Sequence, residues 1–171
     1  MSNVQVVVSG LAWMGSGFCS IEAAIQDLLA DAQKEILLTA YSIGQAEQIF
    51  ELLESALIRG VEVRLVVNCI DEQHHSAQNR LKNLRGKYHH FYLYSFEACN
   101  EQSNLHAKVV VADRQYALVG SSNLSYSGMV VNHELALLVS GEVASQVAKA
   151  IDRLMVNEHC ILVLSHYEMD G

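Results

Sequence analysis

Hydrophobic residues recur along this chain with two alternating periods, one typical of strands and the other of helices. Runs of β-branched and apolar residues such as 4–8 and 61–68 favour strands. Segment 18–33 instead repeats its apolar residues every three or four positions, which predicts an amphipathic helix. On this basis the predicted strands are 4–8, 35–43, 61–68, 89–95, 105–112, 116–121 and 134–140, and the predicted helices are 18–33, 45–59, 75–87 and 143–159.

The order of these elements predicts the fold class. Strands that alternate with helices are typical of an α/β protein, here with a mixed, largely parallel β-sheet sandwiched between helices. With 171 residues the chain is long enough to bury a core of its own, and no composition shift marks a linker. We therefore expect a single domain that spans residues 1–171.

Two predicted strands on either side of Arg114 form a hairpin that gathers polar side chains. A turn at this point sets position 106 opposite about position 122, because antiparallel partners lie at equal offsets from the turn. Residues two apart on a strand share a face, so His106 and Lys108 lie together, as do Ser121 and Asn123. The hairpin then brings Ser121 and Asn123 beside His106.

The polar residues of the hairpin follow a defined pattern, His-x-Lys-x4-Asp-x6-Gly-Ser-x-Asn, carried by His106, Lys108, Asp113, Gly120, Ser121 and Asn123. This pattern resembles that of the phospholipase D superfamily, which implies a phospholipase D-like fold and phosphodiesterase activity. Glu134 has a spacing similar to that of a glutamate in the small single-motif endonucleases of the superfamily. Asp113 lies about 23 Å from His106 at roughly 3.3 Å per strand residue, so we expect it to fix the turn.

The residue types indicate a covalent route through the histidine. A neutral imidazole is a competent nucleophile toward phosphorus, so His106 is the expected nucleophile. Lys108 and Asn123 would hold the non-bridging oxygens, and Ser121 would donate a further hydrogen bond. Glu134 would accept a proton from an imidazole nitrogen and so fix its tautomer. The leaving oxygen also needs a proton, which a second histidine would supply.

The chain contains one copy of the pattern, which predicts an assembly. Similar members of the superfamily pair two copies across a two-fold axis, so that one histidine attacks while its symmetry mate acts as the acid. An isologous dimer places the same residue of both subunits at the axis. We therefore expect an obligate homodimer with one composite site built around two copies of His106.

The formal net charge of −8 argues against a simple electrostatic nuclease, because binding of a phosphate backbone relies on Lys and Arg. A local exception is a candidate basic ridge that would contact nucleic acid, made of Arg80, Lys82, Arg85 and Lys87. The alternative is a solvated helix face. Replacement of these cations by glutamate would separate the two hypotheses.

No metal or cofactor is expected. Eight histidines invite a metal site, but no His/Cys spacing resembles a zinc module. His89 and His90 are neighbours in a predicted strand, so they would point to opposite faces and would not chelate together. The alternative for the motif hairpin is a purely structural role, with a buried histidine that is hydrogen-bonded to its neighbours. The complete pattern argues against this alternative.

Three functional hypotheses follow. The first is a metal-independent nuclease that acts through a phosphohistidine. The second is a phospholipid head-group hydrolase or transferase, which ranks lower because no apolar docking surface or basic amphipathic helix is evident. The third is a regulatory or structural subunit of a larger complex, such as a phage-defence system. Residues 1–33 lack Lys and Arg, no apolar run reaches about 20 residues, and four scattered cysteines fit a reducing compartment, so we expect a cytoplasmic protein without stable membrane association.

Overall fold

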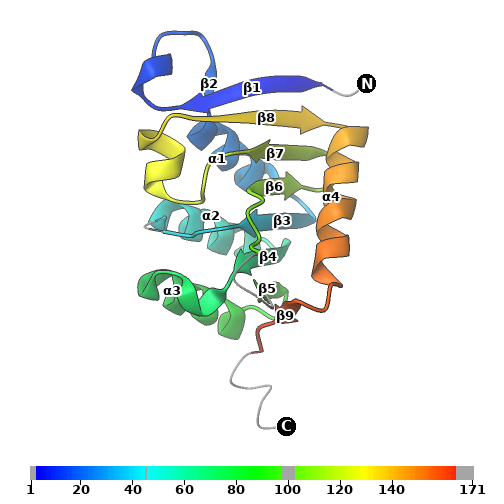
Figure 1. Ribbon diagram of the computed structural model, residues 1–171. Helices are drawn as coiled ribbons and strands as arrows, with labels where there is room; N and C mark the ends of the chain where they lie inside the picture. Colours follow the sequence, from blue (N-terminus) through cyan, green and yellow to red (C-terminus); the bar gives the residue numbers. More distant parts are fainter. Residues whose placement is uncertain (1–2, 45, 98–102, 165–171) are drawn as a thin grey trace.

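A computed structural model describes residues 3–44, 46–97 and 103–164, and within them one sheet forms the centre of the molecule (Figure 1). Its strands are β1 (Val4–Ser9), β2 (Cys19–Ser20), β3 (Glu35–Ala40), β4 (Glu62–Asn68), β5 (Phe91–Phe96), β6 (Val109–Ala112), β7 (Tyr116–Gly120), β8 (Glu134–Ser140) and β9 (Cys160–Leu162). The helices are α1 (Ile21–Asp31), α2 (Glu47–Ile58), α3 (His75–Lys87) and α4 (Glu142–Met155), with short turns η1 (Leu11–Trp13), η2 (Ile70–Glu72) and η3 (Ser127–Val131).

The sheet is mixed, in the order β2-β1-β8-β7-β6-β3-β4-β5-β9. The expected α/β fold with a mixed sheet between helices is confirmed, but the sheet is not largely parallel. Parallel pairing is confined to β1 with β2 and to β3-β4-β5, and the other neighbours are antiparallel. The reason is that β6 and β7 are joined by a tight turn, which only antiparallel strands allow.

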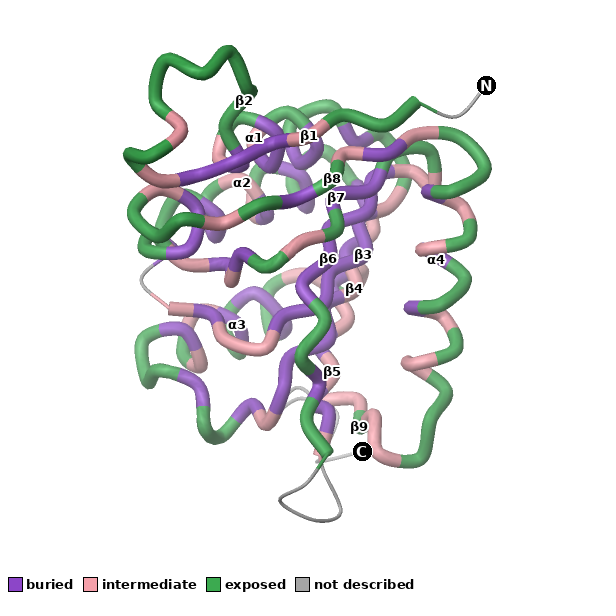
Figure 2. The backbone as a smooth tube through the Cα atoms, turned by 45° about the horizontal axis from the view of Figure 1, so that its top comes forward, coloured by how far each residue is buried: buried purple, intermediate pink, exposed green. Residues whose placement is uncertain are grey.

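Helices cover the two faces of the sheet unequally. Figures 1 and 2 show α1, α2 and α3 on one face and α4 across the other. The larger apolar cluster holds the buried residues of the first three helices, whereas α4 contributes Ala144, Ala148 and Ile151 to a smaller cluster. Strand β3 lies between both layers and is buried at nearly every position, as expected for a strand covered on both sides. No helix in the described part of the chain has the length and apolarity needed to cross a membrane.

Several element boundaries differ from the sequence prediction. The bounds of α3 and β8 are confirmed, but α1 begins at Ile21 because the Ser20 hydroxyl caps it by accepting the Ala23 N–H at 3.0 Å. The predicted start of the second helix, residue 45, lies outside the described residues. Strand β9 was not predicted.

A second correction concerns the adjacent histidines before β5. This strand begins at Phe91, so His89 and His90 lie in the preceding turn and not in the strand. The expectation that they point to opposite faces is therefore wrong, and their ring centroids lie 4.9 Å apart. The His90 Nε2 atom lies 2.9 Å from the carbonyl oxygen of Leu57, which ties this ring to the end of α2.

The β6-β7 hairpin has the predicted register. Val109 pairs with Val119 and Ala112 with Tyr116, so continuation of the same offset sets residue 106 opposite residue 122. The turn contains Asp113 with φ +53° and Arg114 with φ +57°, two consecutive residues in the left-handed region, and the Gln115 N–H donates to the Ala112 carbonyl at 3.0 Å. Strand β6 begins only at Val109, so the motif residues before it lie on an extended entry segment.

Candidate active site

Four segments meet at one end of the sheet and bring the polar motif residues together. The segment 106–108 enters β6, the segment 121–125 leaves β7, β8 begins at Glu134, and the residues after β3 complete the group. The Gly120 N–H donates to the Lys108 carbonyl at 3.3 Å, and Ile43 forms an isolated parallel bridge with Leu124. Backbone pairing between these segments therefore fixes their relative positions independently of their side chains.

His106 and Lys108 are in direct contact. The Lys108 ammonium nitrogen lies 3.2 Å from His106 Nδ1 and 3.4 Å from Nε2, and it also donates to the His106 carbonyl at 3.0 Å. His106 is exposed, whereas Lys108 is buried. An ammonium group only donates hydrogen bonds, so this contact suits a ring nitrogen that carries a lone pair. The structure thus places an exposed imidazole directly beside a buried cation.

Burial changes the acidity of the lysine. Loss of solvent lowers the pKa of Lys108 below its ordinary value, and the nearby Glu134 carboxylate partly opposes this by favouring the charged form. The structure thus places a partly desolvated cation beside the exposed imidazole. A cation in such a position interacts strongly with an incoming anion because little water screens it.

Tyr41 packs against this pair and was missed by the sequence analysis. Its ring centroid lies 4.7 Å from that of His106, with a tilt of 52°, and 5.6 Å from the Lys108 ammonium nitrogen. Tyr41 directly follows β3, at the carboxyl end of a strand that has a parallel neighbour. Such ends commonly form binding crevices in α/β proteins, and this was the signal available in the sequence.

Ser121 and Glu134 form a hydrogen-bonded pair. The Ser121 hydroxyl donates to the Glu134 carboxylate and accepts the Leu135 N–H at 3.3 Å. Among the described residues, no hydrogen bond joins Glu134 to His106, so the expected pairing of that carboxylate with the imidazole is absent from this chain. The carboxylate instead accepts a hydrogen bond from the Ser121 hydroxyl, because the residue after Gly120 lies directly beside the start of β8.

Gly120 and Asn123 occupy tight positions. A Cβ atom at Gly120 would lie 2.3 Å from the Cβ of Ala136, so the close approach of β7 and β8 requires glycine. The Asn123 side-chain oxygen is buried without a hydrogen-bond partner. Buried polar atoms normally find partners, so an unpaired amide oxygen in this cluster fits a place where a ligand group binds. The same amide carries N–H groups, which are the donors that a phosphate oxygen accepts.

The candidate basic ridge on α3 is largely neutralised. Arg80 lies 2.6 Å from Glu47, Lys82 lies 3.8 Å from Asp71, and Lys87 lies 2.6 Å from Glu54. The fourth member, Arg85, is buried with 6% of its surface exposed. The ridge therefore presents paired charges, and the structure does not bring its residues into the cluster around His106.

An exposed apolar loop follows β1. Leu11 and Met14 are each 77% exposed and Phe18 is 53% exposed, so the loop presents apolar side chains that the sequence analysis did not identify. The loop is tied to the residue before Glu134, because the Ala12 N–H donates to His133 Nε2 at 3.1 Å. The apolar loop therefore lies beside the start of β8.

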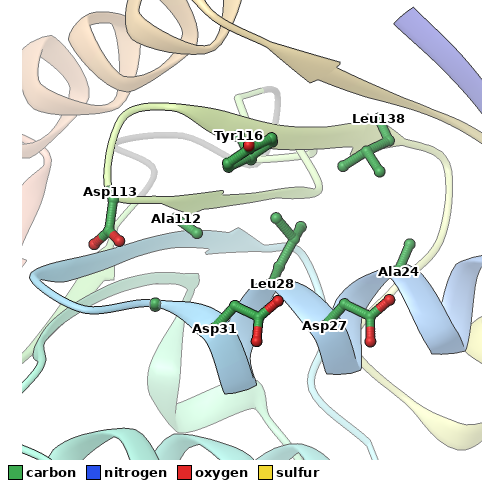
Figure 3. A pocket seen from close by; sticks show the side chains of 9 residues that line it. Ala24, Asp27, Leu28, Asp31, Ala112, Asp113, Tyr116 and Leu138 are labelled. Atoms are coloured by element: carbon green, nitrogen blue, oxygen red, sulfur yellow. The ribbon is translucent and has the colours of Figure 1, made fainter.

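Asp113 lies away from the cluster, at the hairpin turn. Its carboxylate accepts the N–H groups of Gln33, Lys34 and Glu35 at 2.8–3.0 Å, and these bonds lower its pKa, although partial burial opposes them. Figure 3 shows Asp113 at the rim of a pocket of about 340 Å³ between α1 and the hairpin. Within the described residues no group of three potential metal ligands gathers, in this pocket or elsewhere.

Comparison with known proteins agrees with this geometry. Residues 25–155 match the family described as "Cardiolipin synthase, PLD-like domain". The DISARM protein DrmC of Bacillus paralicheniformis is 30% identical over 140 residues, which are 80% of this chain and 57% of that protein. The chain thus spans little more than half the length of this relative.

Two solved structures share the fold. Nuc from Salmonella typhimurium, a phospholipase D family member, has a TM-score of 0.75 and 18% identity, with 96% of this chain and 100% of that chain covered. NucT from Helicobacter pylori has a TM-score of 0.76 and 17% identity, with coverage of 95% and 100%. At such identities the likeness concerns the arrangement of the backbone.

Proposed function

Because this chain belongs to the phospholipase D superfamily of phosphodiesterases, we propose that it hydrolyses nucleic acid without a metal, through a covalent phosphohistidine. The contact between His106 and Lys108 is the observation that supports this most directly. It places an exposed imidazole beside a buried ammonium group. A bound phosphate would replace the imidazole as the acceptor of the lysine and free the ring nitrogen to attack.

The first step forms a bond between a nitrogen of His106 and phosphorus while the bond to the leaving oxygen breaks. Lys108 and the Asn123 amide stabilise the negative charge on the non-bridging oxygens. The Ser121 hydroxyl does not donate to the phosphate while it donates its proton in a hydrogen bond to Glu134. The Ser121–Glu134 pair therefore has a structural role beside the site. In the second step water attacks phosphorus, the bond between phosphorus and His106 breaks, and the general acid of the first step, now neutral, accepts a proton from the water.

The leaving oxygen needs a proton, and we propose that His106 of the partner subunit supplies it in a homodimer. His133 is a poor substitute within the chain, because its Nε2 accepts the Ala12 N–H and its ring packs against Trp13 at 5.8 Å. General-acid help is worth about 10²–10⁴ in rate, so a monomer would lack much of the activity.

The composite site has a quantitative test. Wild-type chain and His106→Ala chain are unfolded, mixed in known ratios and refolded, and turnover of bis(p-nitrophenyl) phosphate is measured in chelator. If both copies of His106 are needed, activity follows the square of the wild-type fraction, because mixed dimers are inactive. A linear dependence of activity on the wild-type fraction would contradict the two-histidine site. So would full activity of a chain that sedimentation shows to be a monomer.

The substrate is tested with the same pair of chains. Single-stranded DNA, duplex DNA, RNA and phosphatidylcholine vesicles are each incubated with wild type and with His106→Ala. We expect cleavage of a nucleic acid that the substitution abolishes. Equal activity of both chains on every substrate would refute the phosphohistidine route. If a nucleic acid is cleaved, glutamate at Arg80, Lys82 and Lys87 tests whether the α3 ridge contributes to its binding.

The apolar loop after β1 supports a second candidate, a phospholipid head-group hydrolase or transferase. Exposed Leu11, Met14 and Phe18 beside the start of β8 offer a surface that an acyl-chain interface favours. The description of the matching family names cardiolipin synthase. Vesicle hydrolysis that is lost on replacement of Leu11 and Met14 by serine, with bis(p-nitrophenyl) phosphate turnover unchanged, would establish this candidate.

The 30% sequence identity with DrmC supports a third proposal, that the chain works within a larger complex. This assembly role is compatible with catalysis, since the motif residues are intact. If the His106→Ala chain still assembles into the complex but the complex loses its phosphodiesterase activity, the chain contributes activity and not only structure.

A further inference from the structure

A buried amide connects residues that lie just beyond the paired stretch of β3 and β4. Gln73 lies between η2 and α3 and is 9% exposed. Its side-chain oxygen accepts the Ile43 N–H at 2.9 Å, and its nitrogen donates to the carbonyls of Tyr41 at 3.1 Å and Asn68 at 2.6 Å. All three of these hydrogen bonds join the amide to backbone atoms at the carboxyl ends of β3 and β4.

A second buried amide continues the connection toward the histidine. Asn68 is 4% exposed, and its side-chain oxygen accepts the Leu105 N–H at 2.8 Å. Leu105 is the residue before His106 and is itself buried. The entry segment of the histidine is therefore anchored to the end of β4 through Asn68, and the end of β4 is anchored to Tyr41 through Gln73.

The anchored tyrosine and the anchored entry segment meet at the His106 ring. That exposed ring contacts the Lys108 ammonium nitrogen, 3.2 Å from Nδ1, and the Tyr41 ring, at a centroid distance of 4.7 Å. We propose that Gln73 and Asn68 are positioning residues that set Tyr41 and Leu105, and through them fix the orientation of the His106 imidazole. This inference rests on the proposed role of His106 in catalysis.

A purely structural role predicts a different outcome. Loss of buried hydrogen bonds destabilises any protein, so a lower melting temperature alone does not identify a positioning residue. A misplaced nucleophile lowers kcat while substrate binding is retained, because positioning acts on the reacting atoms. The separation of kcat from KM therefore distinguishes the two roles.

The first experiment compares Gln73→Met with the matched control Arg59→Met. Arg59 donates to the carbonyls of Leu29 at 2.9 Å and Ala32 at 3.3 Å, near the start of β3 and at the other end of that strand from Tyr41. With bis(p-nitrophenyl) phosphate we expect Gln73→Met to lower kcat by about tenfold to a hundredfold with KM within about twofold. Arg59→Met should lower the melting temperature and leave kcat unchanged. Equal kcat values for the two variants would overturn the proposal.

The tyrosine provides a second pair of variants should Gln73→Met fail to fold. Tyr41→Leu removes the ring and should lower kcat by a similar factor, whereas Tyr41→Phe keeps the ring and should restore most of the activity. A Tyr41→Leu chain with wild-type kcat would contradict a positioning role for the ring.

A spectroscopic measurement separates this inference from the proposed function. Ring protons of His106, assigned by comparison of histidine-labelled wild type with His106→Gln, should carry a ring-current shift from Tyr41. The shift should vanish in Tyr41→Leu and shrink in Gln73→Met even if the wild type hydrolyses nothing. An unchanged His106 spectrum in folded Gln73→Met would refute the positioning network, whereas a changed spectrum without turnover in wild type would refute only the proposed function.

Discussion

Replacement of Asp113 should destabilise the protein strongly while the chemistry of the motif cluster is left intact. The carboxylate accepts three backbone N–H groups, those of Gln33, Lys34 and Glu35, which join the hairpin turn to the segment before β3. A hydrogen bond to a charged group contributes roughly 1.5–3 kcal/mol. Because Asp113 is only partly buried, the lower end applies, and the three bonds together contribute about 4 kcal/mol.

Two substitutions separate these contributions. Asp113→Ala loses all three bonds and places alanine at φ +53°, which adds about 1 kcal/mol, so we expect a loss near 5 kcal/mol in the free energy of unfolding. Asp113→Asn keeps Oδ1, which accepts from Lys34 and Glu35, and loses Oδ2, so we expect a loss of about 1–2 kcal/mol. Urea unfolding measures both values.

The pH dependence supplies an internal check. Backbone hydrogen bonds hold the folded-state pKa of Asp113 below its unfolded value of about 3.9. The stabilisation by the ionised form is therefore present above that unfolded pKa and is lost as pH falls through the folded pKa. The stability difference between wild type and Asp113→Asn should shrink on acidification over this range.

The control for these measurements is Asp31→Asn, which removes the same charge from the rim of the same pocket (Figure 3). Asp31 is exposed, and its carboxylate makes no hydrogen bond with the described residues. This variant should unfold like wild type. The reasoning fails if Asp113→Ala loses less than Asp113→Asn, or if the wild-type difference from Asp113→Asn is unchanged between neutral and acidic pH.

Three further predictions concern the cluster and its support. Because burial lowers the pKa of Lys108, kcat/KM should begin to fall at an alkaline pH below the ordinary lysine pKa. In Lys108→Arg this alkaline decrease should disappear, because arginine stays charged. Wild type and Lys108→Arg with the same alkaline decrease in their pH–rate profiles would contradict the prediction. Ser121→Ala should lower kcat by about tenfold because the Glu134 carboxylate loses its donor, measured with bis(p-nitrophenyl) phosphate against a Ser127→Ala control. Gly120→Ala should destabilise by more than about 2 kcal/mol, whereas Gly86→Ala, which meets nothing within 4 Å, should stabilise by about 0.5–1 kcal/mol in thermal unfolding.

Local sequence patterns predicted the elements that depend on local physics. The helix His75–Lys87 and the strand Glu134–Ser140 appear with the predicted bounds, and the hairpin register follows from a short turn that leaves little choice of pairing. The polarity of Asp113 and its place between two apolar runs sufficed to identify a turn residue. The largely parallel sheet was wrong because the alternation of strands and helices does not show where a hairpin is inserted between parallel units.

The features that the sequence did not predict depend on contacts between distant segments. Tyr41 and Gln73 lie in connections after different elements, and their meeting near His106 follows from the parallel order of β3 and β4. Arg85 was assigned to an exposed ridge because a charged residue on a polar helix is normally solvated, but the packing of α3 buries it. The Ser121–Glu134 pair requires the β7-β8 register, which no local pattern fixes.

The pairing of β1 with β8 has a consequence for biosynthesis. Residues 35–96 form β3, β4 and β5 with their connecting helices from one continuous stretch, whereas Val4 pairs with Val139. Closing the longer loop has the greater entropic cost, and β1 is synthesised before β8, its antiparallel partner. Strand β1 is therefore apolar and unpaired on one edge until β8 has been translated. During that interval it is a natural target for a chaperone, and a source of aggregation where none is at hand.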